Sequence, residues 1–311
     1  MKNISELSVG IILCTFNGEK FLEEQLKSIE NQSFSNWKIY ISDDGSIDQT
    51  VDILLKFQKR IGSNRVKIFQ GEKKGFALNF LFTATKADKN HDFYSFCDQD
   101  DIWFKDKLMN SILRLQHTTD SLSPSLYCSV TTLVNSEGIF IRESLKRRPP
   151  CFRHSLVENI AGGNTMLFNN VAMRMFTSIP LDLKFLSHDW LLYQMVCGKG
   201  GVVFYDFQPS ILYRQHSKNL VSTKFSLLGK LARLKSFFDG SYGVAIRQNI
   251  AIMSQDKSIL TNQNKEILDK FVSLTSKNFF KKINFLFDGR FQRTSFVENF
   301  IFKVGNFFNL I

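Results

Sequence analysis

The sequence predicts an α/β fold in which a mostly parallel sheet is flanked by helices. Short apolar segments alternate, over the first hundred residues, with segments whose apolar side chains recur at helical spacing. Strand, helix, strand and helix at this pitch indicate βαβ units, which build parallel sheets. In addition, polar clusters follow the strands at their carboxyl ends, where such sheets bind ligands.

The elements follow in order along the chain. Residues 9–14 form an apolar run of the kind found in a strand buried on both faces. Strands are expected at residues 9–14, 37–42, 66–69, 92–97, 126–130, 165–168 and 201–205, and helices at about 21–29, 48–60, 75–86 and 191–196. Beyond residue 222 the pattern is mostly helical. No GxGxxG or GxxxxGK[ST] motif occurs, so neither a dinucleotide-binding fold nor a P-loop is supported.

Composition limits the class of protein. The chain has 311 residues, 43% hydrophobic and 22% charged, as in ordinary globular proteins. It has no uninterrupted apolar run of 18 residues, and its first residues lack the apolar core of a signal peptide. Five scattered cysteines without CxxC spacing indicate reduced thiols. These features together predict a cytoplasmic location without a membrane-spanning helix.

A cluster of acids ends the strand at 92–97. Asp98, Asp100 and Asp101 place three carboxylates within four positions. Such crowding is unfavourable without a positive partner, and a divalent cation that carries substrate phosphates is the natural one. The alternative is a solvated acidic turn that caps the next helix.

Six segments, in order, resemble the family 2 glycosyltransferases of GT-A fold, especially the bacterial rhamnosyltransferases of capsule, O-antigen and cell-wall polysaccharide synthesis. They are CTFNGEKFLEEQLKSIENQS at 14–33, ISDDGSIDQT at 41–50, FCDQDDIWFKDKL at 96–108, GGNTMLFN at 162–169, HDW at 188–190 and YRQHSKNLV at 213–221. The resemblance implies transfer of a sugar, with inversion, from a dTDP- or UDP-linked donor to an acceptor hydroxyl.

The resemblance also assigns the nucleoside contacts. Thr15, Asn17 and Glu19 would contact the nucleoside from the loop after the first strand. Asp44 would accept a hydrogen bond from the N3–H of uracil or thymine, which cytosine lacks. Alternatively, Asp43 or Asp44 caps the helix that begins near residue 48.

The acidic cluster corresponds to the family's DxD signature. Asp100 is expected to bind Mn²⁺ or Mg²⁺ directly, and Asp98 to lie near the ribose or a metal-bound water. His216 falls where the family often completes the metal or pyrophosphate site, and its imidazole favours Mn²⁺. Asp101 is expected either to cap the helix entered at residue 105 or 106 or to support the residues that bind the ligand.

The HDW segment matches the position of the family's catalytic base. Asp189 would deprotonate the acceptor hydroxyl, and Trp190 would stack on the acceptor sugar. The alternative for Asp189 is a helix N-cap, and His188 is expected to be structural.

Three further residues complete the expected donor site. Gly163 and Asn164 lie on the loop that would line the donor sugar. Arg214, together with Lys218, would pair with phosphate oxygens.

The C-terminal region differs in composition from the rest. Residues 1–221 are expected to form the catalytic domain, and 222–311 a helical extension with a net charge of +8 and 14 of the 32 phenylalanines. Apolar stripes at 224–238 and 277–308 either pack on the catalytic domain or also hold the enzyme on an anionic membrane, where a lipid-linked acceptor would reside.

Other functions remain open at this stage. A nucleotide-sugar hydrolase or a non-catalytic sugar-binding homologue would share the sheet. No nucleic-acid-binding signature occurs, so a nucleic-acid partner is not expected.

Overall fold

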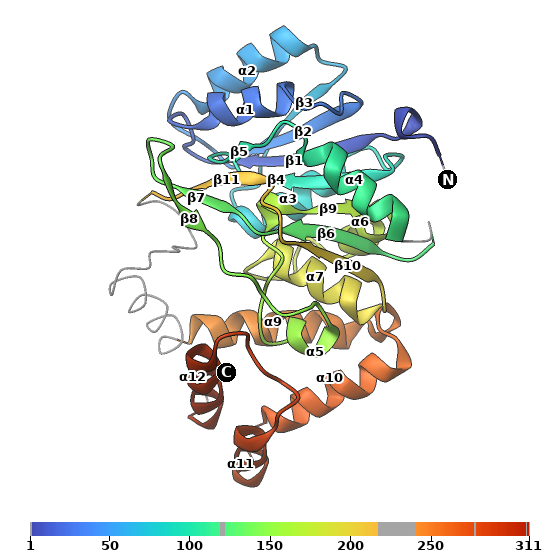
Figure 1. Ribbon diagram of the computed structural model, residues 1–311, viewed down its shortest axis with the longest axis vertical. Helices are drawn as coiled ribbons and strands as arrows, with labels where there is room; N and C mark the ends of the chain where they lie inside the picture. The colour runs from blue at the N-terminus through green and yellow to red at the C-terminus, as the bar shows by residue number, and fades with distance from the viewer. Residues whose placement is uncertain (1, 119–121, 217–239, 277, 309, 311) are drawn as a thin grey trace.

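A central sheet with helices on both faces forms the body of the protein, and further helices extend it at one end (Figure 1). The computed structural model describes residues 2–118, 122–216, 240–276, 278–308 and 310. The helix expected at 224–238 and Lys218 lie outside the described residues.

The larger sheet confirms the predicted α/β fold. In the described part of the chain it has seven strands, in the spatial order β10 (Val202–Asp206), β6 (Ser125–Ser129), β9 (Leu167–Asn169), β4 (Phe93–Cys97), β1 (Val9–Thr15), β2 (Trp37–Asp43) and β3 (Val66–Gln70). The neighbouring pairs are parallel except at β9, which runs antiparallel to both β4 and β6. The sheet is therefore mostly parallel, as expected.

Both faces of the sheet are covered by helices because successive strand residues point to opposite sides. In β1, which is buried throughout, Ile11 and Leu13 join one hydrophobic cluster and Ile12 joins the other. The first cluster contains residues of α1 (Leu22–Glu30), α2 (Thr50–Ile61) and α4 (Lys107–Thr118); the second contains residues of α3 (Phe76–Lys86), α6 (Asn170–Thr177) and α7 (His188–Gly198).

A small second sheet was not predicted. Its strands are β5 (Ile102–Trp103), β11 (Ile211–Arg214), β7 (Thr132–Val134) and β8 (Phe140–Glu143), in that order. Two to four residues are too few for a periodic pattern to be recognised. Because β5 follows the acidic cluster directly and pairs with β11, this sheet brings residues after 211 to the carboxyl end of β4.

The C-terminal helices share a core with the main sheet. They are α9 (Ser241–Gln255), α10 (Asn262–Leu274), α11 (Phe279–Phe287) and α12 (Phe296–Phe307). Phe271, Phe285 and Phe302 are fully buried in the same cluster as the residues of α7. The helical character expected beyond residue 222 is thus confirmed where this region is described. No helix among the described residues has the length and apolarity needed to cross a bilayer.

Buried charges join the C-terminal region to residues 147–158. Glu158, 1% exposed, accepts hydrogen bonds from Arg147, His154 and the backbone N–H of Thr294, each at 2.7 Å. Burial alone would raise the pKa of Glu158, but the hydrogen bond from His154 and the charges of Arg293 and Arg147 outweigh it and lower that pKa to about 2. The ionised carboxylate therefore stabilises the folded state.

This network predicts a pH-dependent contribution to stability. Because the folded-state pKa lies below the unfolded value, the contribution is complete above about pH 4.5 and is lost as the pH falls to about 2. Between these pH limits, the free energy of unfolding of the wild type, measured with denaturant, should fall by about 3 kcal/mol more than that of Glu158→Gln. The control Glu143→Gln, at an exposed carboxylate, should keep the wild-type pH dependence. If the free energy of unfolding depended on pH equally in Glu158→Gln and in the wild type, Glu158 would not be the group responsible.

Candidate functional site

The carboxyl ends of β1, β2 and β4 lie side by side and carry the predicted polar clusters. Thr15 and Asp43 are the last residues of β1 and β2, and they lie opposite each other in the sheet. The Thr15 hydroxyl donates to Asp43 Oδ2 at 2.8 Å, and the other Asp43 oxygen accepts from the backbone N–H of Gly45 and Ser46. Asp43 therefore holds the turn that leads out of β2.

Asn17 and Glu19 join the loop after β1 to the loop after β2. Asn17 lies in the left-handed region, with φ of 47°, and its Oδ1 accepts from the N–H of Ile47 at 3.0 Å. Glu19 Oε2 accepts from the N–H of Gln49 at 2.9 Å. These contacts fix the two loops against each other, and the role of Thr15, Asn17 and Glu19 in nucleoside binding stays a prediction.

Asp44 is held by the loop after β3. Its two carboxylate oxygens accept from the N–H groups of Lys73, at 2.8 Å, and Gly75, at 3.1 Å. The alternative of helix capping by Asp43 or Asp44 is wrong: Asp48 accepts from the N–H of Thr50, the first residue of α2. Asp44 is thus oriented at the edge of the sheet, with base recognition still a prediction.

Asp100 and His216, both predicted metal ligands, lie together. His216 Nε2 and Asp100 Oδ2 are 2.7 Å apart, and the His216 ring stacks on Phe21, with 5.0 Å between the ring centroids. The two residues are 116 positions apart in the chain. Their proximity follows from the pairing of β5 with β11, which the sequence did not reveal.

The charges of two other carboxylates act on Asp98. Burial, followed by the charges of Asp100 and Asp189, raises the pKa of Asp98 to about 8. Asp189 is therefore close enough for its charge to act on Asp98. The site combines the DxD carboxylates with the predicted base.

Asp101 supports the site from the protein side, which is the second of the two roles expected for it. It is fully buried, with Oδ2 accepting from the side-chain amide of Asn164 at 2.7 Å and Oδ1 from the N–H of Arg214 at 3.1 Å. Burial and the charges of Asp100 and Asp98 raise its pKa well above the usual range. The expectation that Asp101 caps the following helix is wrong, because its carboxylate instead ties the 163–165 turn and β11 to the DxD segment.

Asp189 lies in the first turn of α7, where the backbone holds its carboxylate. Oδ2 accepts from the N–H of Gly163 at 3.0 Å, and Oδ1 accepts from the N–H of Trp190 at 2.7 Å and from the Ser187 hydroxyl. A Cβ at position 163 would lie 2.8 Å from His188 Nε2, so glycine permits this close approach. Ser187, and not Asp189, occupies the N-cap position of the helix.

His188 has a structural environment, as expected. Its ring stacks on Phe80, with 3.8 Å between centroids, and also contacts Phe96 and Phe76. Burial lowers its pKa to about 4, although the charge of Asp189 acts in the opposite direction. A neutral, enclosed imidazole does not compete with Asp189 as a base.

The predicted stacking role of Trp190 is wrong. Its side chain is 5% exposed, and Nε1 donates to the carbonyl oxygen of Ser155 at 2.7 Å. The ring packs on Tyr242 of α9, at 5.5 Å between centroids. Residues 189 and 190 point in different directions from the helix, so Trp190 faces the core and offers no surface to a sugar.

The predicted phosphate contact of Arg214 is also wrong. The residue is 2% exposed, and its guanidinium donates to the carbonyl oxygens of Asp100, at 3.1 Å, and Ser136, at 2.8 Å, and to Glu24. It also lies over the Phe21 ring, 4.7 Å from the centroid. Arg214 therefore holds the backbone of the loop that carries Asp98, Asp100 and Asp101. Glu24 and Phe21 gave no sequence signal beyond the helical pattern of α1.

The side chains at this edge of the sheet are of the types that bind a divalent cation. Carboxylate oxygens of Asp98 and Asp100 and the imidazole of His216 are ligand types that Mn²⁺ and Mg²⁺ accept, the imidazole favouring Mn²⁺. Among the described residues, no three or more His, Cys, Asp or Glu side chains are already grouped as a metal site. Asp100 and His216 instead contact each other directly.

Comparisons with known proteins show the family of the chain. The family model described as glycosyl transferase family 2 matches residues 10–173, more than half of the chain. A dTDP-rhamnosyl transferase, RfbG of Shigella flexneri, is 31% identical over 81% of this chain and 87% of its own length.

Two further matches are more distant. The UDP-Glc:alpha-D-GlcNAc-diphosphoundecaprenol beta-1,3-glucosyltransferase WfgD of Escherichia coli is 32% identical over 32% of this chain and 38% of its own. The mannosyltransferase PcManGT of Pyrobaculum calidifontis, solved in complex with GDP-Man and Mn²⁺, has a TM-score of 0.53 and 12% identity, covering 98% of this chain and 88% of its own. The similarity to PcManGT shows a shared fold. The chain therefore belongs to glycosyl transferase family 2, has the GT-A fold and resembles a rhamnosyltransferase over most of its length.

Proposed function

We propose that this protein is an inverting, metal-dependent glycosyltransferase that moves a sugar, with rhamnose as the first candidate, onto a growing surface polysaccharide such as a capsule or O-antigen. The donor would be a dTDP- or UDP-linked sugar. The similarity to a dTDP-rhamnosyl transferase over four-fifths of the chain supports the choice of donor.

One observation carries the proposal most directly. Asp100 contacts His216, 116 residues away in the chain, and the charges of both Asp100 and Asp189 act on Asp98. A single displacement needs a base on one side of the sugar and a stabilised leaving group on the other. The arrangement provides residues for both tasks.

The reaction is a single exchange of bonds at the anomeric carbon. Asp189 accepts the proton of the acceptor hydroxyl while that oxygen forms a bond to the anomeric carbon. The bond from this carbon to the diphosphate oxygen breaks, and its electron pair leaves with the nucleoside diphosphate. The N–H groups of Gly163 and Trp190 hold the carboxylate in place.

The remaining residues bind and orient the donor. Asp100 and His216 would hold the divalent cation, and Asp98 would lie beside the ribose or a metal-bound water. The cation, when bound, offsets the charge that develops on the departing diphosphate. Asp44, held by two backbone N–H groups, would accept from N3–H of thymine or uracil.

A lipid-linked acceptor is the second part of the proposal. The partial similarity to a glucosyltransferase whose name specifies a diphosphoundecaprenol acceptor supports it. Such an acceptor is confined to the bilayer, so the enzyme would work as a peripheral protein at the cytoplasmic face of the membrane.

The donor class is tested by thermal unfolding in the presence of dTDP, UDP, GDP and CDP, each with and without Mn²⁺. Because a ligand that binds only the folded state raises its apparent stability, dTDP or UDP with Mn²⁺ should raise Tm and CDP should not. Stabilisation by CDP but not by dTDP or UDP would contradict the role of Asp44, because cytosine has no N3–H to donate. Release of free sugar at the same rate with and without acceptor would favour a hydrolase.

A further inference from the structure

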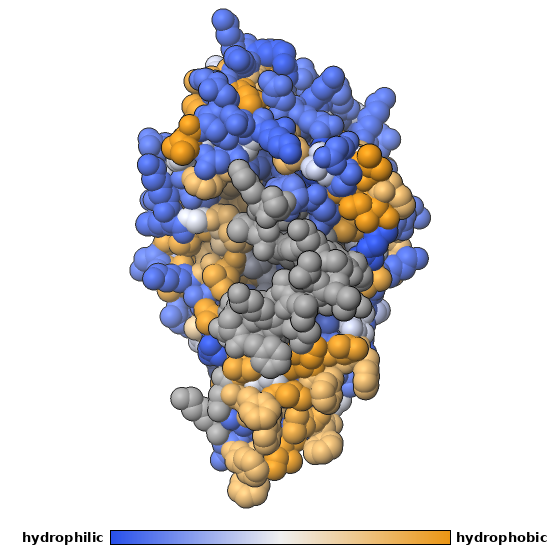
Figure 2. All heavy atoms as spheres, turned by 90° about the vertical axis from the view of Figure 1, so that its left-hand side faces the viewer, coloured by the Kyte–Doolittle hydropathy of each residue, from blue (hydrophilic) through white to orange (hydrophobic). Residues whose placement is uncertain are grey.

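The two last helices expose an aromatic surface. We call this surface the α11–α12 face, and it consists of Phe279, Phe280, Phe287, Phe296, Val297, Phe300 and Phe308, which are 58 to 85% exposed. Figure 2 shows hydrophobic side chains gathered at this end of the molecule. A contiguous apolar surface of this kind on a soluble domain marks an interaction site.

Each helix is anchored by one phenylalanine and presents the others outward. Phe285 of α11 and Phe302 of α12 are fully buried and contact each other, with 5.6 Å between ring centroids. On the outside, Phe279 packs against Phe280 and Phe307 at about 6 Å. The exposed rings are therefore held by a packed pair of helices and do not belong to a loose tail.

The surroundings of this face are basic. Residues 277–311 contain six Lys or Arg and two acidic residues, a net charge of +4. Both acids are paired internally: Asp288 with Arg290, at 3.0 Å, and Glu298 with Arg293, at 2.9 Å. Since these two pairs are neutral, the lysines of the segment carry its net positive charge.

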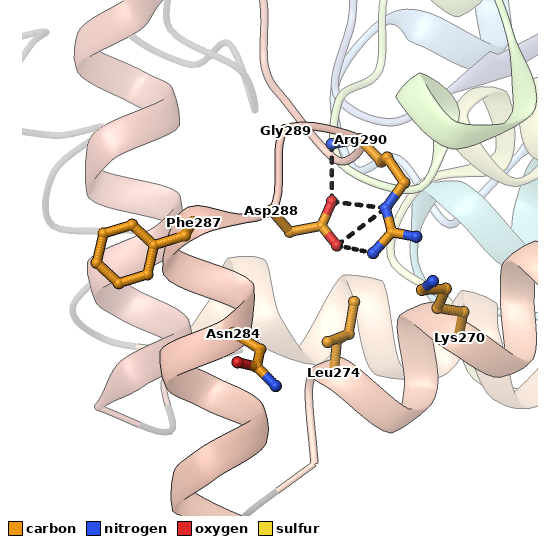
Figure 3. Close-up of a pocket in the computed structure, with 7 residues that line it drawn as sticks. All are labelled: Lys270, Leu274, Asn284, Phe287, Asp288, Gly289 and Arg290. Carbon is orange, nitrogen blue, oxygen red and sulfur yellow. Dashed lines mark hydrogen bonds and ion pairs between the residues drawn. The ribbon is translucent and has the colours of Figure 1, made fainter.

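A cavity of about 460 Å³ adjoins the same face (Figure 3). Lys270 and Arg290 lie on one side of it, while Phe287, 84% exposed, points away on the other. Exposed cations beside exposed aromatic rings are the arrangement expected at the boundary between lipid headgroups and acyl chains.

We propose that the α11–α12 face docks on an anionic lipid bilayer, with Phe287, Phe296 and Phe300 entering the interface. Lys270 and Lys281 would meet the headgroup phosphates. A second copy of the chain fits less well, because a symmetric contact would set the same positive charge against itself. This inference rests on the proposed function, since a lipid-linked acceptor gives the enzyme a reason to dock.

The face is rigidly connected to the catalytic helix. Arg293, just before α12, donates to the carbonyl oxygen of Val157 at 2.8 Å and contacts Tyr242, whose ring packs on Trp190 beside Asp189. The N–H of Thr294 binds Glu158. Docking through α11 and α12 would therefore fix the orientation of the site relative to the membrane.

Vesicle flotation of the full chain tests the proposal. The vesicles contain phosphatidylcholine alone, or phosphatidylcholine mixed with phosphatidylglycerol. The wild type should float with the mixed vesicles and on the order of tenfold less with the neutral ones, and added salt should release it. The triple variant Phe287→Ser/Phe296→Ser/Phe300→Ser and the charge variant Lys270→Glu/Lys281→Glu should both lose binding. Val51→Ser/Leu55→Ser, on α2 at the opposite end of the molecule, should float as the wild type does.

Three results would overturn the docking proposal. They are no flotation of the wild type, equal flotation with neutral and anionic vesicles, and a wild-type dimer in solution that the triple variant abolishes. Sugar transfer to a water-soluble acceptor separates this proposal from the proposed function. The rate of this transfer should be the same in the triple variant and in the wild type. If the wild type floated with the vesicles but transferred no sugar, only the proposed function would be contradicted.

Discussion

Replacing Asp189 with Asn should lower the rate of sugar transfer by roughly 10²–10⁴-fold, the usual contribution of a general base. Asparagine keeps the size of the side chain and one oxygen that can accept from the N–H of Trp190 or Gly163. It cannot take a proton from the acceptor hydroxyl. The measurement is the initial rate at saturating donor and acceptor, together with nucleotide affinity by calorimetry, which should stay at the wild-type value.

Ser187→Ala is the matched control for this variant. It removes a hydroxyl that donates to the same carboxylate but leaves the base in place. Its rate should fall less than that of Asp189→Asn, because the carboxylate remains and keeps the N–H groups of Gly163 and Trp190. If Asp189→Asn retained nearly full turnover, another group would have to be the base.

Replacing Asp100 with Ala should remove the metal-dependent part of nucleotide binding. The change deletes the carboxylate that lies 2.7 Å from His216 and leaves one imidazole and Asp98. The dissociation constant of the nucleotide in Mn²⁺ should rise by on the order of 10–100-fold, approaching the value in EDTA. Calorimetry in the two buffers measures this difference.

Asp106→Ala serves as the control for the loss of a carboxylate near the acidic cluster. Asp106 is exposed and lies after β5, beyond the acidic cluster. It should leave the effect of Mn²⁺ on nucleotide affinity unchanged. Equal Mn²⁺ dependence in Asp100→Ala and the wild type would show that the cation, if required, binds elsewhere.

The main sheet was predictable because its strands are long and apolar. The run at residues 9–14 became β1, buried throughout, and the helical pattern after it became α1. The strands of the second sheet escaped prediction because they have only two to four residues each. The pairing of β5 with β11 also joins segments more than a hundred residues apart, which a local pattern does not contain.

In the candidate site, the chemistry of side chains was easier to predict than their direction. Asp100 and His216 were both assigned to the metal site, and they lie together. Trp190 and Arg214 were assigned ligand contacts from their residue types, but both are buried and bound to the protein. Whether an aromatic ring or a guanidinium faces solvent depends on packing, here against Tyr242 and Phe21.

The stereochemistry of the product tests the central claim most directly. NMR of the glycoside formed by the wild-type enzyme from an activated nucleotide donor gives the anomeric configuration before and after transfer. A single displacement with Asp189 as base predicts inversion. Retention of the donor configuration would contradict this mechanism, because it requires two successive displacements or a different reacting geometry.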